Sequence, residues 1–140
     1  MNSGCHAGSS RRGFTLIEIS LVIFIMIALL SFGFGLSSAI TNWKLGRAGS
    51  EILRSAYTAQ RTYLADHPTT AVTSLTQAML LPYLPDGPAA FPTCTSLTKT
   101  MLFVRVNVSP PVLTATAGGV AGATYDPSGK TNDSLWDVGE

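Results

Sequence analysis

Acidic side chains at two places in the sequence have positions or spacings that could support chemistry. Glu18 lies near the start of a long run of apolar and small residues, from Phe14 to Ile40. A carboxylate at the centre of a bilayer costs about 2.5–3.5 kcal/mol, so such a group usually has a partner and a function. The second place is the stretch from Tyr125 to Asp137, which is dense in oxygen donors. The first place predicts an ion pair, and the second predicts a cation site.

Glu18 has two interpretations. No Lys or Arg follows it at helical spacing within the run, so no partner is provided there. Arg11 and Arg12 lie upstream and reach it by snorkelling only while they remain attached to the chain. The alternative is a Glu close enough to the lipid headgroups to be hydrated. Position alone leaves both interpretations open.

The run that contains Glu18 is predicted to be a transmembrane helix. About 20 apolar residues at 1.5 Å each span a hydrocarbon core of roughly 30 Å, and residues 14–40 exceed this length. The apolar region of a secretory signal would be about 7–15 residues long and would end at a small-residue cleavage site. The run instead continues into a helical pattern, so we expect the helix to be retained.

The residues around the start of the run form a more specific motif. The segment Arg11-Arg12-Gly13-Phe14-Thr15-Leu16-Ile17-Glu18, followed by the apolar helix, resembles the class III signal of type IV prepilins and pseudopilins. The resemblance implies cleavage after Gly13 by a prepilin peptidase on the cytoplasmic face and methylation of the Phe14 amine. It also implies that Glu18 pairs with the N-terminal ammonium of a neighbouring subunit. Two buried charges become tolerable when they are paired in this way.

The resemblance also implies a function, partners and a location. We expect a structural subunit of a type II secretion pseudopilus, anchored once in the bacterial inner membrane, with a cytoplasmic N-terminus and a periplasmic C-terminal domain. The implied partners are further copies of the chain, other pseudopilins, the prepilin peptidase, the inner-membrane secretion platform and membrane lipid. Charge alone leaves the orientation open, because Lys44 and Arg47 follow the run. The resemblance to the class III signal implies the orientation, because the prepilin peptidase acts on the cytoplasmic face.

Two other functions stay open. A type IV or competence pilin of a surface filament is one alternative. The absence of proline from the apolar run and of a C-terminal disulfide pair favours a major pseudopilin over it. The second alternative is a signal-anchored periplasmic binding or enzymatic domain. Such a domain would need a pocket with convergent titratable groups, and the sequence offers few of them.

Composition and motifs point away from nucleic acid and from catalysis. The formal net charge is +1, and no basic patch indicates a nucleic-acid partner. His67 precedes Pro68, where a capping role is more common than a catalytic one, and no hydrolase, zinc-protease or redox motif is present. We therefore expect no enzyme. Cys5 belongs to the predicted leader, which makes Cys94 a lone thiol.

The oxygen donors near the C-terminus could hold calcium. Ca²⁺ takes six to eight oxygen ligands, and Asp126, Asn132, Asp133 and Asp137 supply them if the loop folds back on itself. The spacing is not that of an EF-hand, and the alternative is a solvated loop in which these side chains cap turns. The Asp-Pro-x-Gly segment followed by Trp-Asp is similar to the C-terminal loop of major pseudopilins, although Lys130 departs from that pattern. This resemblance implies calcium as a cofactor.

The remaining sequence predicts the elements that position these groups. Apolar residues at three- and four-residue steps predict that the helix continues through residues 41–67 and ends before Pro68. Glu51 and Arg54 are spaced for an ion pair on this helix. The predicted apolar stripe consists of Leu45, Ala48, Ile52, Ala56, Ala59 and Tyr63.

Residues 68–140 are expected to form a small periplasmic α/β domain, which we call the cap. A loop and a second helix are predicted up to Tyr83, with Leu75, Met79 and Leu80 packing inward. Alternating residues predict strands over 101–108 and 112–116, followed by a turn at Gly118-Gly119. The division is therefore leader 1–13, transmembrane helix 14–40, amphipathic helix 41–67 and cap 68–140. The predicted fold is α+β and pilin-like, with one long helix packed under a small antiparallel sheet.

Overall fold

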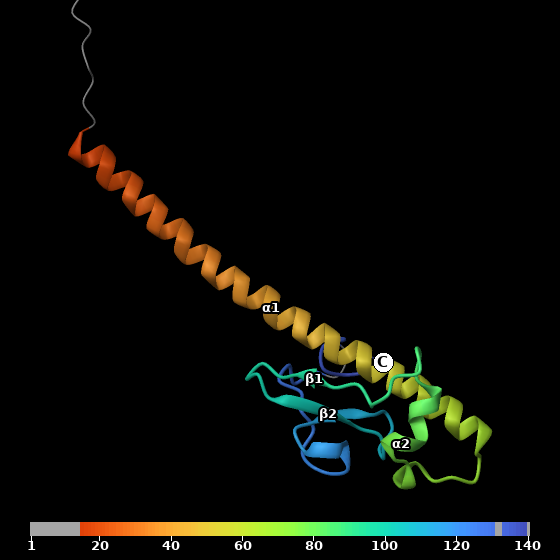
Figure 1. The fold of residues 1–140 in the computed structure, drawn as a ribbon. Coiled ribbons are helices and arrows are strands. Elements are labelled where there is room, and N and C mark those ends of the chain that lie inside the picture. Colours follow the sequence, from red (N-terminus) through yellow and green to blue (C-terminus); the bar gives the residue numbers. More distant parts are fainter. Residues whose placement is uncertain (1–14, 131–132, 140) are drawn as a thin grey trace, which may run out of the picture. The chain divides into compact units, whose positions relative to one another are not determined.

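The computed structural model describes residues 15–130 and 133–139. One long N-terminal helix packs with a small antiparallel sheet, which confirms the predicted α+β class (Figure 1). The chain divides into two compact units, one ending at Ser38 and the other beginning at Ala39. The elements are α1 (Leu16–Asp66), α2 (Gln77–Leu80), β1 (Cys94–Thr95), β2 (Met101–Arg105) and β3 (Val112–Thr114).

The first part of α1 is long and apolar enough to cross a membrane. Its large apolar side chains are exposed, including Phe24 at 72% and Phe32 at 82%. Gly33 and Gly35 keep helical geometry within this part, and a Cβ atom at either position would meet nothing. No residue in 15–130 or 133–139 therefore covers this part of the helix, and its surface is chemically suited to lipid or to another apolar helix.

The second part of α1 contributes a face rich in small residues to the core of the cap. The predicted stripe shares only Ala56 and Ala59 with this face, while Ala48 is exposed and Ile52 is half-buried. The prediction is confirmed in part, since Leu45, Ile52 and Tyr63 also pack half-buried against the core, but it missed the small buried residues because it followed apolar ones. A closely packed helix face also buries Gly and Ser, whose small size lets neighbouring side chains approach. The buried residues of the helix are Gly46, Gly49, Ser50, Leu53, Ala56, Ala59 and Gln60.

Strand β2 is the centre of the three-stranded antiparallel sheet, in the order β1-β2-β3. Cys94 pairs with Leu102, and Val104 pairs with Leu113. Leu102, Val104 and Leu113 are fully buried and join Leu53 of α1 in the core. The predictions of β2 and β3 are confirmed. Strand β1 was not predicted, because two residues are too few for alternation to be visible.

Strand β2 ends at Arg105, earlier than the predicted 101–108. Val106 stays buried but leaves the ladder, because a side chain of α1 takes the place of a neighbouring strand. The Gln60 Nε2 atom donates hydrogen bonds to the carbonyl oxygens of Val106, at 2.9 Å, and Val108, at 2.8 Å. The chain then returns as β3 and turns at Gly119. Its φ of 62° suits glycine, and a Cβ there would overlap the Val104 carbonyl oxygen.

Gln60→Leu should destabilise the cap, because the buried Val106 carbonyl and the part-buried Val108 carbonyl would lose their donor. The expected decrease in the free energy of unfolding is about 2 kcal/mol, since an unpaired buried polar group costs roughly 1–3 kcal/mol. Denaturant unfolding followed by circular dichroism measures it. Thr62→Ala is the matched control, because Thr62 is exposed on the same helix and bonds only to Thr58. A Gln60→Leu variant as stable as this control would contradict the prediction.

The connection between α1 and the sheet is less helical than predicted. It contains a 3-10 turn over Val72–Ser74, the four-residue helix α2 and a second 3-10 turn over Leu81–Tyr83. Leu75 and Leu80 are buried as predicted, but Met79 is 40% exposed. A helix of four residues has too few turns to bury two neighbouring positions. The prolines that follow it also prevent its extension.

Candidate functional site

Glu18 lies in the first turn of α1 and is exposed. The Thr15 carbonyl oxygen accepts hydrogen bonds from the Glu18 and Ile19 backbone N–H groups at 3.0 and 3.2 Å. A negative charge is favourable at this end of a helix, where backbone N–H groups lack partners. Within residues 15–130 and 133–139, the Glu18 carboxylate has no hydrogen bond or ion pair. It is therefore available to a cation outside this part of the chain.

Several of the predicted site residues lie outside the described residues. These are the leader residues Arg11, Arg12 and Gly13, the N-methylation position Phe14, and the candidate calcium ligand Asn132. Their predicted roles stay predictions. Asp126, Asp133 and Asp137 are among the described residues.

Trp136 locks the C-terminal segment onto α1. Its side chain is 4% exposed and lies over the small residues Gly46 and Gly49. A Cβ atom at Gly46 would lie 2.9 Å from the Trp136 Nε1 atom, and one at Gly49 would lie 3.2 Å from the ring. The Trp136 backbone N–H also donates a hydrogen bond to the Gly46 carbonyl oxygen at 3.2 Å. The Tyr125 ring meets the indole edge-on, with 5.2 Å between the ring centroids. The two glycines thus form a notch that holds the indole.

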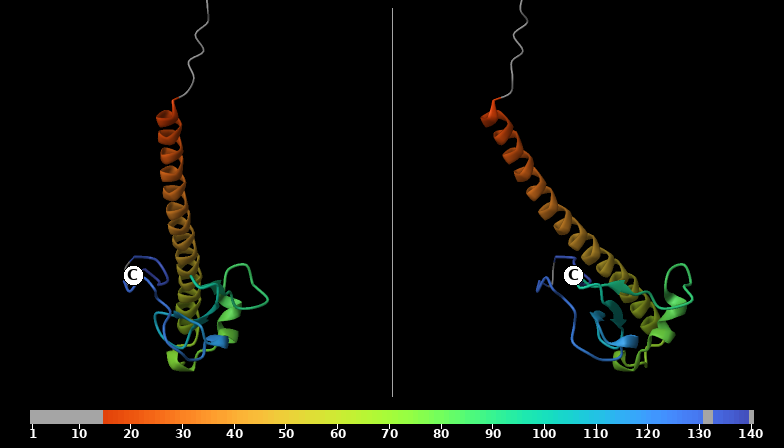
Figure 2. Two further views of the ribbon diagram at one scale, coloured as in Figure 1. Left: turned by 90° about the vertical axis from the view of Figure 1, so that its left-hand side faces the viewer. Right: turned by 60° about the vertical axis from the view of Figure 1, so that its left-hand side comes forward.

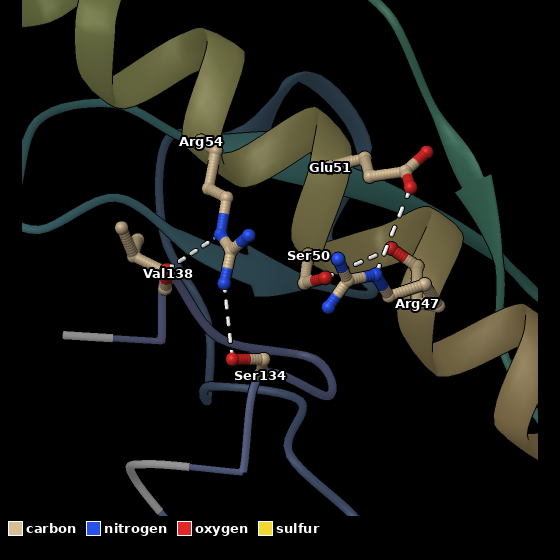
Figure 3. A network of polar contacts seen from close by, with 6 residues as sticks. All are labelled: Arg47, Ser50, Glu51, Arg54, Ser134 and Val138. Atoms are coloured by element: carbon tan, nitrogen blue, oxygen red, sulfur yellow. Dashed lines mark hydrogen bonds and ion pairs between the residues drawn. The ribbon is translucent and has the colours of Figure 1, made fainter.

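Arg54 forms the second attachment of the same segment. Its Nε donates to the Val138 carbonyl oxygen and its Nη2 to the Ser134 Oγ, both at 3.0 Å (Figure 3). Ser134 and Trp136 have positive φ values of 58° and 66°, so the segment is tightly curled where it is held. In Figure 2 this segment and the connection that contains α2 lie on opposite flanks of α1.

The ion pair on this part of α1 differs from the predicted one. Glu51 contacts Arg47 at 3.7 Å rather than Arg54, and both side chains are well exposed (Figure 3). The prediction was wrong because the Arg54 guanidinium faces the C-terminal segment. An exposed pair of this kind contributes at most about 1 kcal/mol. Its role in holding the cap is therefore minor beside that of Arg54.

The three described aspartates lie near one another without forming a ligand shell. The Asp126 Oδ1 atom accepts from the Ser128 N–H and hydroxyl at 3.0 and 2.7 Å, and the Asp133 Oδ1 accepts from the Leu135 N–H at 2.9 Å. These are the turn-capping bonds of the alternative interpretation. Among the residues the structure describes, no three acidic, histidine or cysteine groups converge as metal ligands do.

Asp137 is the unusual member of this group. Both of its carboxylate oxygens are buried and make no hydrogen bond of good geometry with a described residue. Burial raises the pKa of Asp137, and the charges of Asp133 and Asp126 raise it further. The Gly139 N–H and the Arg54 guanidinium lower this pKa without cancelling the rise. A cation near these three carboxylates would relieve both effects.

Comparison with protein-family models, curated proteins and solved structures gave no match for this chain. Its function is therefore inferred from its own residues and geometry.

The sequence did not reveal the attachment of the C-terminal segment. Arg54 was predicted to face Glu51, and Gly46 and Gly49 were not singled out. A usable signal was present, because two glycines three residues apart in a soluble helix are costly unless something packs against them. Trp136 is the large side chain that matches them.

Cys94 is a half-buried free thiol, and burial raises its pKa to about 11. A thiol with the ordinary value of 9.0 would carry about 100-fold more thiolate at pH 8. Two variants that both carry Cys5→Ser are compared. In the first, Cys94 is the one remaining thiol; in the second, Thr93→Cys with Cys94→Ser moves the thiol to an exposed position. We expect Cys94 to react with iodoacetamide about 100-fold more slowly than the cysteine at position 93. The rate should keep rising as the pH approaches 11. Equal rates for the two positions at pH 8 would contradict this.

Proposed function

We propose that the chain is a structural subunit of a type II secretion pseudopilus, one that polymerises through α1 and drives protein export across the outer membrane. In this proposal it is anchored once in the bacterial inner membrane, with a cytoplasmic N-terminus and a periplasmic cap. Its partners are further copies of itself, other pseudopilins, the prepilin peptidase and the inner-membrane secretion platform. A pilin subunit of a surface filament is the alternative within the same assembly chemistry.

The single observation that supports this proposal is the difference between the exposed first part of α1 and its buried second part. Its first part leaves a continuous apolar surface exposed, whereas its second part is built into the core of the cap. Glu18 is the one charged residue between Leu16 and Ile40. A helix used only as an anchor needs no carboxylate at that position, but a helix that packs beside copies of itself can use one to set their alignment.

Assembly would proceed by adding one α1 helix at a time to a bundle in the membrane. Cleavage after Gly13 would create an ammonium at Phe14, four residues before Glu18. The Glu18 carboxylate of one subunit would then accept the Phe14 ammonium of its neighbour, which removes both charges from the apolar surroundings together. Apolar contacts between neighbouring helices would hold the growing fibre, and the caps would cover it.

The test is intact mass and N-terminal sequencing of protein purified from its native membrane. The expected chain begins at N-methylated Phe14. A membrane-bound chain that retains Met1 to Gly13 would overturn the processing on which assembly depends. The same sample should contain oligomers when cross-linked in the membrane, and a strictly monomeric processed chain would contradict polymerisation.

We also propose that the cap takes up Ca²⁺ in the loop that contains Asp126, Asn132, Asp133 and Asp137. The proposal is supported by the buried, unpaired carboxylate oxygens of Asp137 and by the neighbouring charges of Asp126 and Asp133. These residues supply hard oxygen donors, which are the ligands that Ca²⁺ prefers. Bound Ca²⁺ would draw the loop around the carboxylates and lower the pKa of Asp137.

Calcium should raise the unfolding temperature of the cap, and Asp137→Asn should remove that response. A site saturated 100-fold above its dissociation constant adds about 2.7 kcal/mol of stability. Scanning calorimetry of the purified protein with Ca²⁺ or with a chelator measures this. Mg²⁺ serves as the ion control, and Asp86→Asn serves as the variant control because Asp86 lies at an exposed turn elsewhere in the cap. An equal response of Asp137→Asn and wild type would exclude this site.

A further inference from the structure

A shallow groove lies where the cap meets the end of the apolar part of α1. It has a volume of about 260 Å³, and residues of the helix line one side while two loops of the cap line the other. The helix contributes Ala39, Asn42 and Trp43, and the cap contributes Leu97, Pro127 and Leu135. We call these six residues the rim.

The rim lies at the level where a membrane surface must be if α1 spans a bilayer. The apolar run ends at Ile40, and Ala39 already lines the groove together with cap residues, so the groove begins within the last residues of the run. The residues from Leu16 to Trp43 extend about 40 Å along a helix at 1.5 Å per residue. A bilayer with its headgroup layers is about 40–45 Å thick, which places Trp43 among the headgroups of the far leaflet.

The side chains of the rim suit that layer. Trp43 is 56% exposed and Leu97 is 37% exposed. Tryptophan is enriched at membrane–water interfaces, where its ring meets acyl chains and its N–H meets headgroups. Lys44 follows Trp43, and Lys99 lies at the same hairpin turn as Leu97; both are exposed. A lysine at this level can extend its ammonium to lipid phosphates.

The hairpin turn that carries Leu97 is held firmly in place. The Leu97 N–H donates to the Tyr125 hydroxyl at 3.0 Å, and the Ser96, Thr98 and Thr100 hydroxyls bond to one another at 2.8–2.9 Å. Leu97 therefore keeps its exposed position at the rim rather than folding into the core.

We propose that the rim docks onto the lipid headgroup layer, with Trp43 and Leu97 inserted at the boundary between headgroups and acyl chains. The inference rests on the membrane anchoring in the proposed function. It adds a second contact between the protein and the membrane, made by the cap itself. A lipid surface is favoured over a second copy of the chain because the rim continues directly from the apolar run and combines aromatic, aliphatic and lysine side chains at one level.

The test places a tryptophan at Leu97 and measures quenching of its fluorescence by brominated lipids. The full chain carries Trp43→Phe together with Leu97→Trp and is reconstituted in phosphatidylcholine vesicles. Emission is compared with that of Trp43→Phe alone, in which only the buried Trp136 remains. The matched control is Trp43→Phe with Met79→Trp, because Met79 is also exposed but belongs to α2 near the far end of α1.

Lipids brominated near the headgroup end of the chain should quench most of the added emission from Leu97→Trp and none of that from Met79→Trp. Equal quenching of the added emission in Leu97→Trp and Met79→Trp, in protein that floats with the vesicles, would overturn the rim proposal. Membrane anchoring would remain intact. Protein that fails to float with vesicles would overturn both. If the emission of the Leu97→Trp variant is not quenched by brominated lipid but changes with the protein-to-lipid ratio, the rim contacts a second copy of the chain. That result would also overturn the proposal.

Discussion

Glu18→Ala is expected to abolish filament assembly while leaving the cap folded and the chain in the membrane. The variant would leave the Phe14 ammonium of each neighbour unpaired beside apolar helices. An unpaired charge among apolar helices is unfavourable. The cost recurs at every subunit added, so even a modest penalty per contact stops growth. The measurement is the amount of fibre sheared from cells that overproduce the chain together with its own secretion system.

Ser20→Ala provides the matched control for this experiment. Ser20 lies on the same exposed part of α1, and its hydroxyl bonds only to the Ile17 carbonyl oxygen of its own helix. Its loss should leave assembly at the wild-type level. Carbonate extraction and protease resistance of the cap establish that both variants are inserted and folded. Normal fibres from inserted Glu18→Ala would refute the pairing of Glu18 with the N-terminus.

Trp136→Ala is expected to cost the cap about 3–5 kcal/mol of stability, the range for removing a large buried aromatic side chain. The indole fills the notch over Gly46 and Gly49, where the helix has no side chains of its own to close the space. Its loss would also free the segment that Arg54 holds. For a domain of this size the unfolding temperature should fall by roughly 10 °C or more. Thermal unfolding in detergent, followed by circular dichroism, measures the fall.

The other tryptophan of the chain is the control. Trp43 is 56% exposed, so Trp43→Ala should change the stability of the cap in detergent by no more than about 0.5 kcal/mol. The comparison separates packing from the mere loss of an aromatic residue. Similar unfolding temperatures for Trp136→Ala and Trp43→Ala would show that the notch does not hold the segment.

The sequence predicted elements that depend on short-range periodicity. The long helix follows from its apolar run and from Pro68, and strands β2 and β3 follow from alternating residues. The α+β class follows from these elements together. In each case the physical cause lies within a few residues of the element itself, so one stretch of sequence contains the information.

Features that depend on contacts between distant residues were not predicted. Arg54 faces Ser134 and Val138, which lie 80 and 84 residues away, rather than Glu51 three residues before it. A local spacing rule favours the near partner, but packing of the C-terminal segment decides the actual one. The small residues of the buried face of α1 were missed for a related reason, because Gly46 and Gly49 are covered by side chains from distant parts of the sequence, Leu113, Leu135 and Trp136.

The candidate site shows the same division. The position of Glu18 at the start of α1 was predictable from sequence, since helix boundaries are local. The unpaired state of the buried Asp137 oxygens was not, because it depends on how the segment curls against α1. The Arg54 guanidinium donates to the Val138 carbonyl oxygen and to the Ser134 hydroxyl, so neither of these hydrogen bonds goes to the Asp137 carboxylate.

The notch also has a consequence for the order in which the chain is made. The ribosome completes Gly46 and Gly49 long before Trp136, because about 90 residues separate them, and at 5–20 residues per second this takes roughly 5–18 s. During that interval the helix has emerged with its notch open and two glycines unsupported. Closure of the domain therefore waits for a late part of the chain. A translation product that ends before Trp136 would lack the indole that fills the notch, and its core would stay incomplete.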